Sequence, residues 1–143
     1  MVALLKNLLM LFGAGICLIA LGMIFLGAQT LGEICTYLLG FVWADPLSPD
    51  LSSVDSDSEL RFYSVFFLVF GCFVLRAGRN FPNSGHHIPL LLAIFFMGGL
   101  ARLLSWVSVG RPEALFQFLM YLEITVPIML GVLFWLARGQ SAR

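Results

Sequence analysis

LLMLFGAGICLIALGMIFL, residues 8–26, is an unbroken apolar stretch that carries no charged side chain. A helix rises about 1.5 Å per residue, so a stretch of this length matches the roughly 30 Å hydrocarbon core of a bilayer. The stretch is longer than the apolar region of a secretory signal peptide, and no small-residue cleavage site follows it. We therefore predict that residues 8–26 form a transmembrane helix.

Three further apolar segments are candidates for membrane spans: residues 60–77, 88–109 and 114–137. The first of them is the shortest and begins beside Arg61, whose long side chain can extend from a helix end to the membrane surface. The other two each contain one charged residue, Arg102 and Glu123 respectively. We expect all three segments to be membrane-spanning helices, which gives four spans in total. Between the second, third and fourth spans we predict a polar pocket that opens outward.

The composition indicates the same class of protein. Of the 143 residues, 60% are hydrophobic and 11% are charged, whereas soluble domains are roughly 45–50% apolar and 25% charged. These proportions exclude a water-soluble globular domain. We predict a single all-α membrane domain over residues 1–143, a four-transmembrane-helix bundle with a short amphipathic helix in its first extracytoplasmic loop. The net charge is zero, so nothing indicates binding to nucleic acid.

The distribution of charged residues predicts the orientation in the membrane. Basic residues without acidic neighbours lie near the N-terminus, around the turn at 78–87 and near the C-terminus: Lys6, Arg76, Arg79, Arg138 and Arg143. The 28–59 connection instead holds six acidic residues and no basic one: Glu33, Asp45, Asp50, Asp55, Asp57 and Glu59. Because basic residues are enriched on the cytoplasmic side, we expect both termini in the cytoplasm and the 28–59 loop outside.

The 28–59 loop has a pattern of its own. Apolar residues recur at helical spacing at Leu31, Ile34, Leu38 and Val42, and the aromatic residues Tyr37, Phe41 and Trp43 accompany them. This pattern predicts a short amphipathic helix over residues 31–43 that lies on the outer leaflet or covers the mouth of the bundle. At the other end of the loop, Ser56 and Glu59 have the spacing of a capping box and are expected to start the second membrane helix.

Charged residues inside the predicted spans are the main functional signal. Arg102 lies seven residues before the outer end of its helix and Glu123 nine residues after the outer start of the next one, which corresponds to depths of roughly 10 and 14 Å. A charge in mid-membrane costs about 2.5–3.5 kcal/mol, so these two should face the bundle interior and pair. Glu59, Arg61 and Tyr63 lie at the outer start of the second span, and we predict them as further members of an outward-opening ligand site.

Pro127 lies in the same predicted helix as Glu123. A proline at this position cannot donate the hydrogen bond that the Glu123 carbonyl would normally accept, so the helix should kink there. Kinked helices beside an intramembrane acid often line a cavity. A purely structural interpretation remains open: the Arg102–Glu123 pair can fix the helix register, and Glu59 can serve only as part of a helix cap.

The remaining motifs give weaker signals. Asp55, Asp57 and Glu59 alternate as at the start of a calcium loop, but the required glycine and the later glutamate are missing. His86 and His87 have no further ligand at metal-binding spacing. Three cysteines are present, at Cys17, Cys35 and Cys72. They form no C-x-x-C motif, and we interpret them as structural or lipid-exposed thiols. We predict no metal site.

At three places the sequence resembles a bacterial four-helix membrane family that is known only as a domain of unknown function: ELRFY at residues 59–63, GGLARL at residues 98–103, and Glu123. The resemblance spans most of the chain and implies a location in the bacterial cytoplasmic (inner) membrane, but it supplies no reaction. The general layout also looks like the DoxX-type group of small four-helix proteins, some of which are associated with quinone or thiol oxidation systems.

Three classes of function follow from these observations. The first is a binding or accessory protein whose polar site takes a small amphiphile, a lipid, a quinone-like ligand or a partner protein; Arg102 would be a fixed donor, and Glu123 would balance its charge or accept a proton. The second is an oligomeric transporter or channel subunit with Glu123 as a proton or cation relay. The third is a redox-associated membrane subunit, although no nucleophile with a positioned base is evident.

The residues themselves predict no cofactor, and a quinone is the one cofactor left open. As partners we expect the lipid bilayer and either further copies of the chain or another membrane protein.

Overall fold

The computed structural model describes residues 1–40, 50–83 and 85–141. Helices make up most of this part of the chain, and it contains no strand. The helices are α1 (Val2–Leu26), α2 (Ala28–Leu39), α3 (Val54–Arg79), the short 3-10 helix η1 (Gly85–His87), α4 (Ile88–Val109) and α5 (Ala114–Ser141). The predicted all-α fold is confirmed.

Four of these helices are long and apolar enough to cross a membrane, namely α1, α3, α4 together with η1, and α5 as far as Arg138. The chain is therefore a multi-pass membrane protein with four spans, as predicted. The bounds of α4 are those expected from the sequence, and α5 begins at the expected residue. However, α1 begins at Val2 rather than at residue 8, and α3 begins at Val54 rather than at residue 60.

The earlier start of α3 corrects the predicted capping box at Ser56 and Glu59. The N-cap is Ser53, whose hydroxyl accepts a hydrogen bond of 3.1 Å from the backbone N–H of Ser56. The first turn then contains Asp55 and Asp57, whose negative charges are favourable near a helix N-terminus. The capping-box prediction was wrong because an equivalent serine three residues upstream can already satisfy the first free N–H groups.

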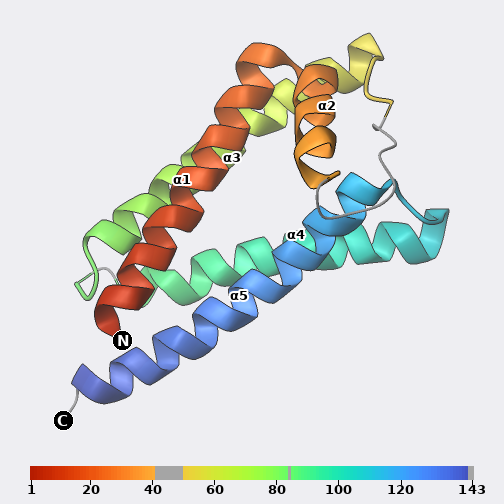
Figure 1. Ribbon diagram of the computed structural model, residues 1–143. Helices are drawn as coiled ribbons and strands as arrows, with labels where there is room; N and C mark the ends of the chain where they lie inside the picture. The colour runs from red at the N-terminus through yellow and green to blue at the C-terminus, as the bar shows by residue number, and fades with distance from the viewer. Residues whose placement is uncertain (41–49, 84, 142–143) are drawn as a thin grey trace.

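The spans are arranged as two closely packed helix pairs, α1 with α3 and α4 with α5. Figure 1 shows that the two pairs meet at the end where both chain termini and the α3–α4 turn lie, and that they diverge toward the opposite end. Helix α2 lies between the diverging ends and contacts α1, α3 and α5. The fold is therefore closed at one end by helix packing and spanned at the other end by α2.

The hydrophobic core lies at the end where the termini meet. It is built from the start of α1, the end of α3, the turn after α3, the start of α4 and the second half of α5. Its members include Leu5, Leu9, Val74, Ala77, Phe81, Ile88, Leu92, Leu130, Phe134 and Ala137. Burial of these side chains against one another fixes the relative positions of the two helix pairs. The opposite ends of the two pairs lie outside this core and are connected through the contacts of α2.

Glycines allow α1 and α3 to approach until their backbones touch. A methyl group added at Gly13 would lie 2.8 Å from the backbone nitrogen of Leu75, and one added at Gly71 would lie 3.1 Å from that of Cys17. Both distances are shorter than ordinary van der Waals contact, so a side chain at either position would push the helices apart. Small residues at such contacts are typical of helix packing in membranes.

Helix α2 confirms that the first loop contains a short helix. The residues predicted to form its apolar face are, however, partly buried and partly exposed. Leu31 is buried against the rest of the protein, whereas Ile34 and Leu38 are 43% and 60% exposed. The buried face of α2 instead consists of Ala28, Leu31, Gly32 and Thr36. Phe41, Val42 and Trp43, which were expected to extend this helix, lie outside the described residues.

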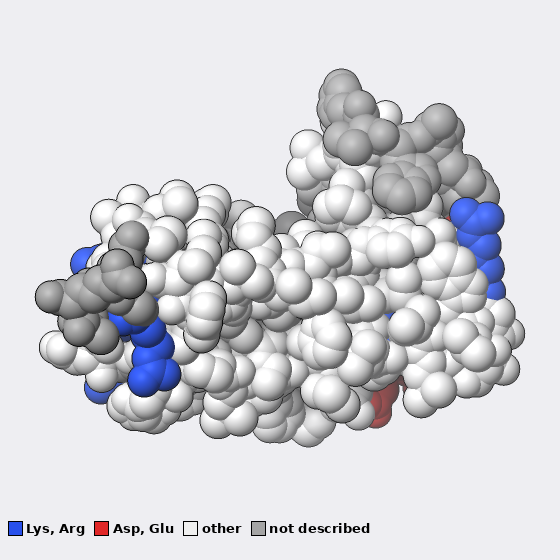
Figure 2. All heavy atoms as spheres, turned by 90° about the horizontal axis from the view of Figure 1, so that it is seen from below, with Lys and Arg blue, Asp and Glu red and all other residues white. Residues whose placement is uncertain are grey.

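The charged residues are concentrated toward the two ends of the molecule. Figure 2 shows Lys and Arg atoms at the end that carries the termini, and a broad surface of other residues between this group and the charged atoms toward the opposite end. The uncharged middle includes many exposed large apolar side chains, such as Leu18, Phe66, Leu104 and Trp135. This surface fits the acyl-chain region of a bilayer.

Candidate functional site

The centre of the candidate site is an ion pair between α4 and α5. Arg102 Nε donates a hydrogen bond of 2.8 Å to Glu123 Oε2. The side chain of Glu123 is 11% exposed and that of Arg102 is 36% exposed. The prediction that these two intramembrane charges pair within the protein is confirmed.

Glycines on α4 make room for the carboxylate. Gly98 and Gly99 precede Arg102 by four and three residues, so all three lie on the face of α4 that meets α5. A methyl group added at Gly99 would lie 3.1 Å from Glu123 Cβ and 2.7 Å from a side-chain carbon of Ile124, whereas one added at Gly98 would lie 3.8 Å from Glu123 Oε2. Gly99 thus sets the close approach of the helices, and Gly98 borders the carboxylate.

Phe116 is a member of the site that the sequence analysis did not identify. The guanidinium carbon of Arg102 lies 5.7 Å from the centroid of the Phe116 ring, within the range of a cation–π contact. Phe116 precedes Glu123 by seven residues, which is two helical turns, so both side chains lie on the same face of α5. This spacing is the signal that could have identified it.

The terminal amino groups of Arg102 have no hydrogen-bond partner in the part of the chain that the structure describes. Its Nε bonds to Glu123, and its guanidinium carbon lies over the ring of Phe116. Within residues 1–40, 50–83 and 85–141, no acceptor bonds to Nη1 or Nη2. A guanidinium has five N–H donors in a fixed fork, so Arg102 retains the part of the fork that recognises phosphate and carboxylate groups.

Pro127 follows Glu123 by four residues in α5, and the helix continues through it. Because proline has no N–H, the carbonyl oxygen of Glu123 cannot receive its usual helical hydrogen bond. Both Pro127 and Glu123 are buried. The backbone carbonyl therefore adds a second polar group of Glu123 to the α4–α5 contact. The kink at Pro127 stays a prediction.

Arg61 has partners of a different kind, at the junction of α1, α2 and α3. Its Nε bonds to Asp57 Oδ2 at 2.6 Å, and its Nη1 donates to the carbonyl oxygen of Ile24 at the end of α1. Asp57 Oδ1 accepts a 2.9 Å hydrogen bond from the backbone N–H of Ala28, the first residue of α2. We call these four residues the Asp57–Arg61 clamp. It holds the chain at Gly27, where a positive φ of 85° separates α1 from α2.

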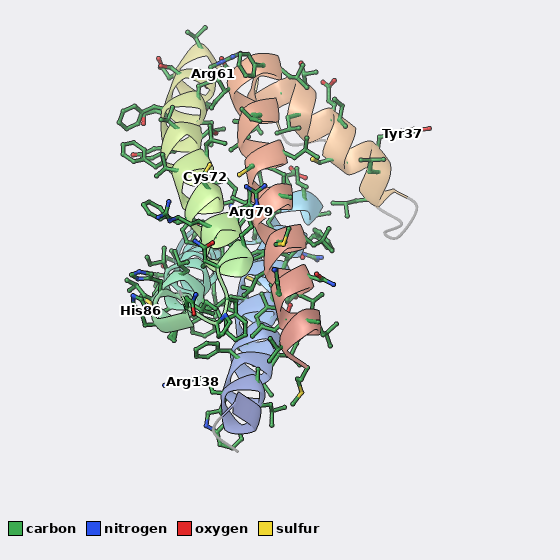
Figure 3. The ribbon with its side chains drawn as sticks, turned by 90° about the vertical axis from the view of Figure 1, so that its left-hand side faces the viewer. Tyr37, Arg61, Cys72, Arg79, His86 and Arg138 are labelled. Carbon is green, nitrogen blue, oxygen red and sulfur yellow. The ribbon has the colours of Figure 1, made fainter. Side chains whose placement is uncertain are left out.

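The other two sequence-predicted site residues lie on the surface of α3. Glu59 is exposed, and Tyr63 is 60% exposed with its ring in contact with Phe62. Figure 3 shows Arg61 at the end of α3 near the α1–α2 junction. None of the contacts of Glu59, Arg61 or Tyr63 within the described residues involves Arg102 or Glu123. Their role as ligand-binding residues stays a prediction.

Metal ligands do not gather in the described part of the chain. No group of three or more His, Cys, Asp or Glu residues lies close enough there to hold a metal ion. His86 and His87 are exposed residues of η1, and their rings are tilted against each other with centroids 3.8 Å apart. The chemistry of the α4–α5 site therefore consists of an arginine fork, a carboxylate and an aromatic face.

Comparison with known proteins identifies a family. A family model described as "Domain of unknown function (DUF4345)" matches residues 4–136. The curated proteins and the solved structures give no match. The resemblance to a four-helix family of unknown function is thus confirmed over nearly the whole chain, and the likeness to the DoxX-type group stays a prediction.

Proposed function

The chain belongs to the family described as a domain of unknown function (DUF4345), and we propose that it is a membrane-embedded binding protein. Its ligand is a lipid or small amphiphile with a phosphate or carboxylate head group. The head group binds at the terminal amino groups of Arg102 and its apolar chain lies along α4 and α5. Accessory binding to a partner protein and binding of a quinone-like ligand are the alternatives within the same class.

One observation carries this proposal. Arg102 is fixed by Glu123 at 2.8 Å and by Phe116, yet its side chain is 36% exposed and its terminal amino groups lack partners among the described residues. Ionisable groups within membrane spans are costly and are commonly functional. An arginine held through Nε alone keeps two amino groups for an external anion, and the bound anion would offset the remaining desolvation of the guanidinium.

The depth of the site supports an amphiphilic ligand. Arg102 lies seven residues from the end of α4, roughly 10 Å along the helix axis. A head group can reach this depth from the membrane surface while its chain remains among acyl tails. A fully water-soluble anion would have to leave the aqueous phase without an apolar part to compensate.

The proposed opening faces outward. Lys6, Arg76, Arg79 and Arg138 lie in the helix segments near the end that carries the termini, and we take this end as cytoplasmic by the positive-inside rule. Arg102 and Glu123 lie toward the opposite end, where α2 contacts α5. In this proposal α2 covers the head group of the bound amphiphile.

The binding test compares two arginines with the same substitution. Arg102→Lys keeps the charge that pairs with Glu123 but removes the planar fork. Arg111→Lys is the matched control, because Arg111 is exposed and, among the residues that the structure describes, bonds through its side chain to Gln117 alone, at 3.4 Å. Dodecyl phosphate, dodecanoate and decylubiquinone are added to the purified chain in neutral detergent, and the thermal unfolding midpoint is measured.

The proposal expects dodecyl phosphate or dodecanoate to raise the unfolding midpoint of the natural chain and of Arg111→Lys. Binding to Arg102→Lys should be weaker by about ten-fold, because one charge-assisted hydrogen bond contributes roughly 1.5–3 kcal/mol. Stabilisation by decylubiquinone alone would identify the quinone alternative. Equal responses of the natural chain and Arg102→Lys to every compound would reject the site.

A transport or channel subunit is the second candidate, and the burial of Glu123 favours it. The side chain of Glu123 is 11% exposed, Pro127 lies in the next helical turn, and buried intramembrane carboxylates recur in proton relays. Four helices rarely form a complete transporter, so this function requires several copies of the chain. Proton flux into proteoliposomes that is lost in Glu123→Gln would support it, whereas our proposal expects no flux above that of empty liposomes.

A further inference from the structure

A second pair of reactive groups lies between α1 and α3, away from the α4–α5 site. Cys17 Sγ and Cys72 Sγ are 4.0 Å apart. Cys17 is partly buried and also lies 3.9 Å from the carbonyl oxygen of Leu68, whereas Cys72 is exposed. Figure 3 shows Cys72 on α3 beside α1. The sequence placed both thiols within spans but could not show that they meet.

The helices are in backbone contact at this level. A methyl group added at Gly71, the residue before Cys72, would lie 3.1 Å from Cys17 N and 2.8 Å from Cys17 Sγ. A disulfide needs sulfurs about 2.05 Å apart and Cβ atoms about 3.5–4.5 Å apart, so these sulfurs need to approach by roughly 2 Å. For a link to form, the two side chains must rotate so that the sulfurs close this gap.

The surroundings of Cys72 determine which oxidant can reach it. Phe73 and Val69 are exposed apolar neighbours on the same helix, and this part of α3 is within a membrane-capable segment. A polar oxidant partitions poorly into such a surface, whereas an apolar hydroperoxide dissolves in it. Cys72 is exposed there and Cys17 is partly buried, so Cys72 is the more accessible of the two thiols.

We propose that Cys17 and Cys72 are a modification site, at which an apolar hydroperoxide from the bilayer converts the two thiols into a disulfide that links α1 to α3. In the first step the sulfur of Cys72 takes the terminal oxygen of the hydroperoxide, the O–O bond breaks, and an alcohol leaves with the thiol proton. In the second step the sulfur of Cys17 attacks the resulting sulfenic acid, the S–O bond breaks, and water leaves with the second proton. The two thiols lose two electrons and the hydroperoxide is reduced.

The experiment uses the full chain in membranes with Cys35→Ser, which removes the third thiol. Cumene hydroperoxide is added, remaining thiols are blocked, and the intact mass and the digested peptides are measured. The proposal expects a product lighter by two hydrogen atoms, in which the peptides that contain Cys17 and Cys72 are joined. The same peptides should separate after reduction.

The matched control moves one thiol by a single residue. Cys35→Ser combined with Cys72→Ser and Phe73→Cys keeps an exposed thiol on α3 but turns it about 100° around the helix axis. We expect this chain to form the intramolecular link about ten-fold more slowly, because the second step depends on access of one sulfur to the other. Absence of the link in the chain that retains Cys17 and Cys72, or equal linkage in both chains, overturns the proposal.

Discussion

Two arginine–carboxylate pairs within the described residues differ in how many of their polar atoms have hydrogen-bond partners. In the Asp57–Arg61 clamp, both carboxylate oxygens and two guanidinium nitrogens have partners, which come from α1, α2 and α3. In the α4–α5 pair, one hydrogen bond joins Arg102 to Glu123, and among the described residues nothing bonds to Glu123 Oε1 or to the terminal amino groups of Arg102.

This difference separates a structural contact from a candidate site. The clamp lies at Gly27, between α1 and α2, and the backbone groups there bond to Arg61 Nη1 and Asp57 Oδ1. The Arg102–Glu123 pair lies deeper, on two regular helices whose backbone groups are mostly satisfied by the helices themselves. Its unused donors and acceptor are available to a ligand, and substitutions in the two regions should therefore have different consequences.

The largest expected effect comes from removing one charge of the α4–α5 pair. Glu123→Leu leaves Arg102 without its counter-charge, and we expect the free energy of unfolding to fall by about 3–5 kcal/mol. Arg102→Leu combined with Glu123→Leu should recover most of this loss, since replacing both charges by apolar residues is often nearly neutral. Unfolding in detergent with increasing denaturant measures both variants.

The same double variant should no longer respond to dodecyl phosphate or dodecanoate. Recovery of stability without recovery of binding would separate the ligand role of the pair from its structural role. A double variant as unstable as Glu123→Leu would contradict the assignment of this stability to the Arg102–Glu123 contact.

An intermediate effect is expected at the glycines that border the pair. Gly99→Val introduces atoms where even a methyl group would lie 2.7 Å from Ile124 and 3.1 Å from Glu123, and overpacking of this kind costs about 1–3 kcal/mol. Gly98→Ala is the control, because its added methyl group meets Glu123 Oε2 at an ordinary 3.8 Å. Equal unfolding free energies for these two variants would contradict the close approach of α4 and α5 at Gly99.

The smallest effect on the whole molecule is expected at the clamp. Asp57→Ala removes the partner of Arg61 Nε and the acceptor for Ala28 N–H. Hydrogen–deuterium exchange should become faster in α2 while α4 and α5 keep their protection, since the hydrogen bonds of the clamp join α1, α2 and α3. Faster exchange spread evenly over all helices would show that the two regions are coupled.

The sequence was sufficient for the spans and for the central pair. The bounds of α4 followed from its apolar run, and the pairing of Arg102 with Glu123 followed from their similar depth and the cost of isolated charges in hydrocarbon. Both inferences use properties of single residues in a membrane, which do not depend on the details of packing.

The partners of Arg61, the buried face of α2 and the start of α3 could not be predicted in the same way. They depend on contacts between residues, which the spacing of apolar residues along the sequence does not reveal. The sequence predicts Arg61 in the same outward-opening site as Arg102. Its partners are instead the backbone carbonyl of Ile24 and the carboxylate of Asp57, which lies one helical turn before it. The division of α2 into a buried Leu31 and an exposed Leu38 depends on its position between the two helix pairs. The start of α3 depended on which of several nearby serines became the cap.

The most direct test of the central claim is the separation of Arg102 Nε from the carboxyl carbon of Glu123 in lipid bilayers. Solid-state NMR on the chain with ¹⁵N-labelled arginine and ¹³C-labelled glutamate measures this dipolar coupling. A hydrogen-bonded pair should give a resolved coupling for a separation of about 3.5–4 Å, and the coupling should disappear in Glu123→Leu. Absence of a coupling that depends on Glu123 would show that the two charges do not meet inside the membrane and would contradict the account.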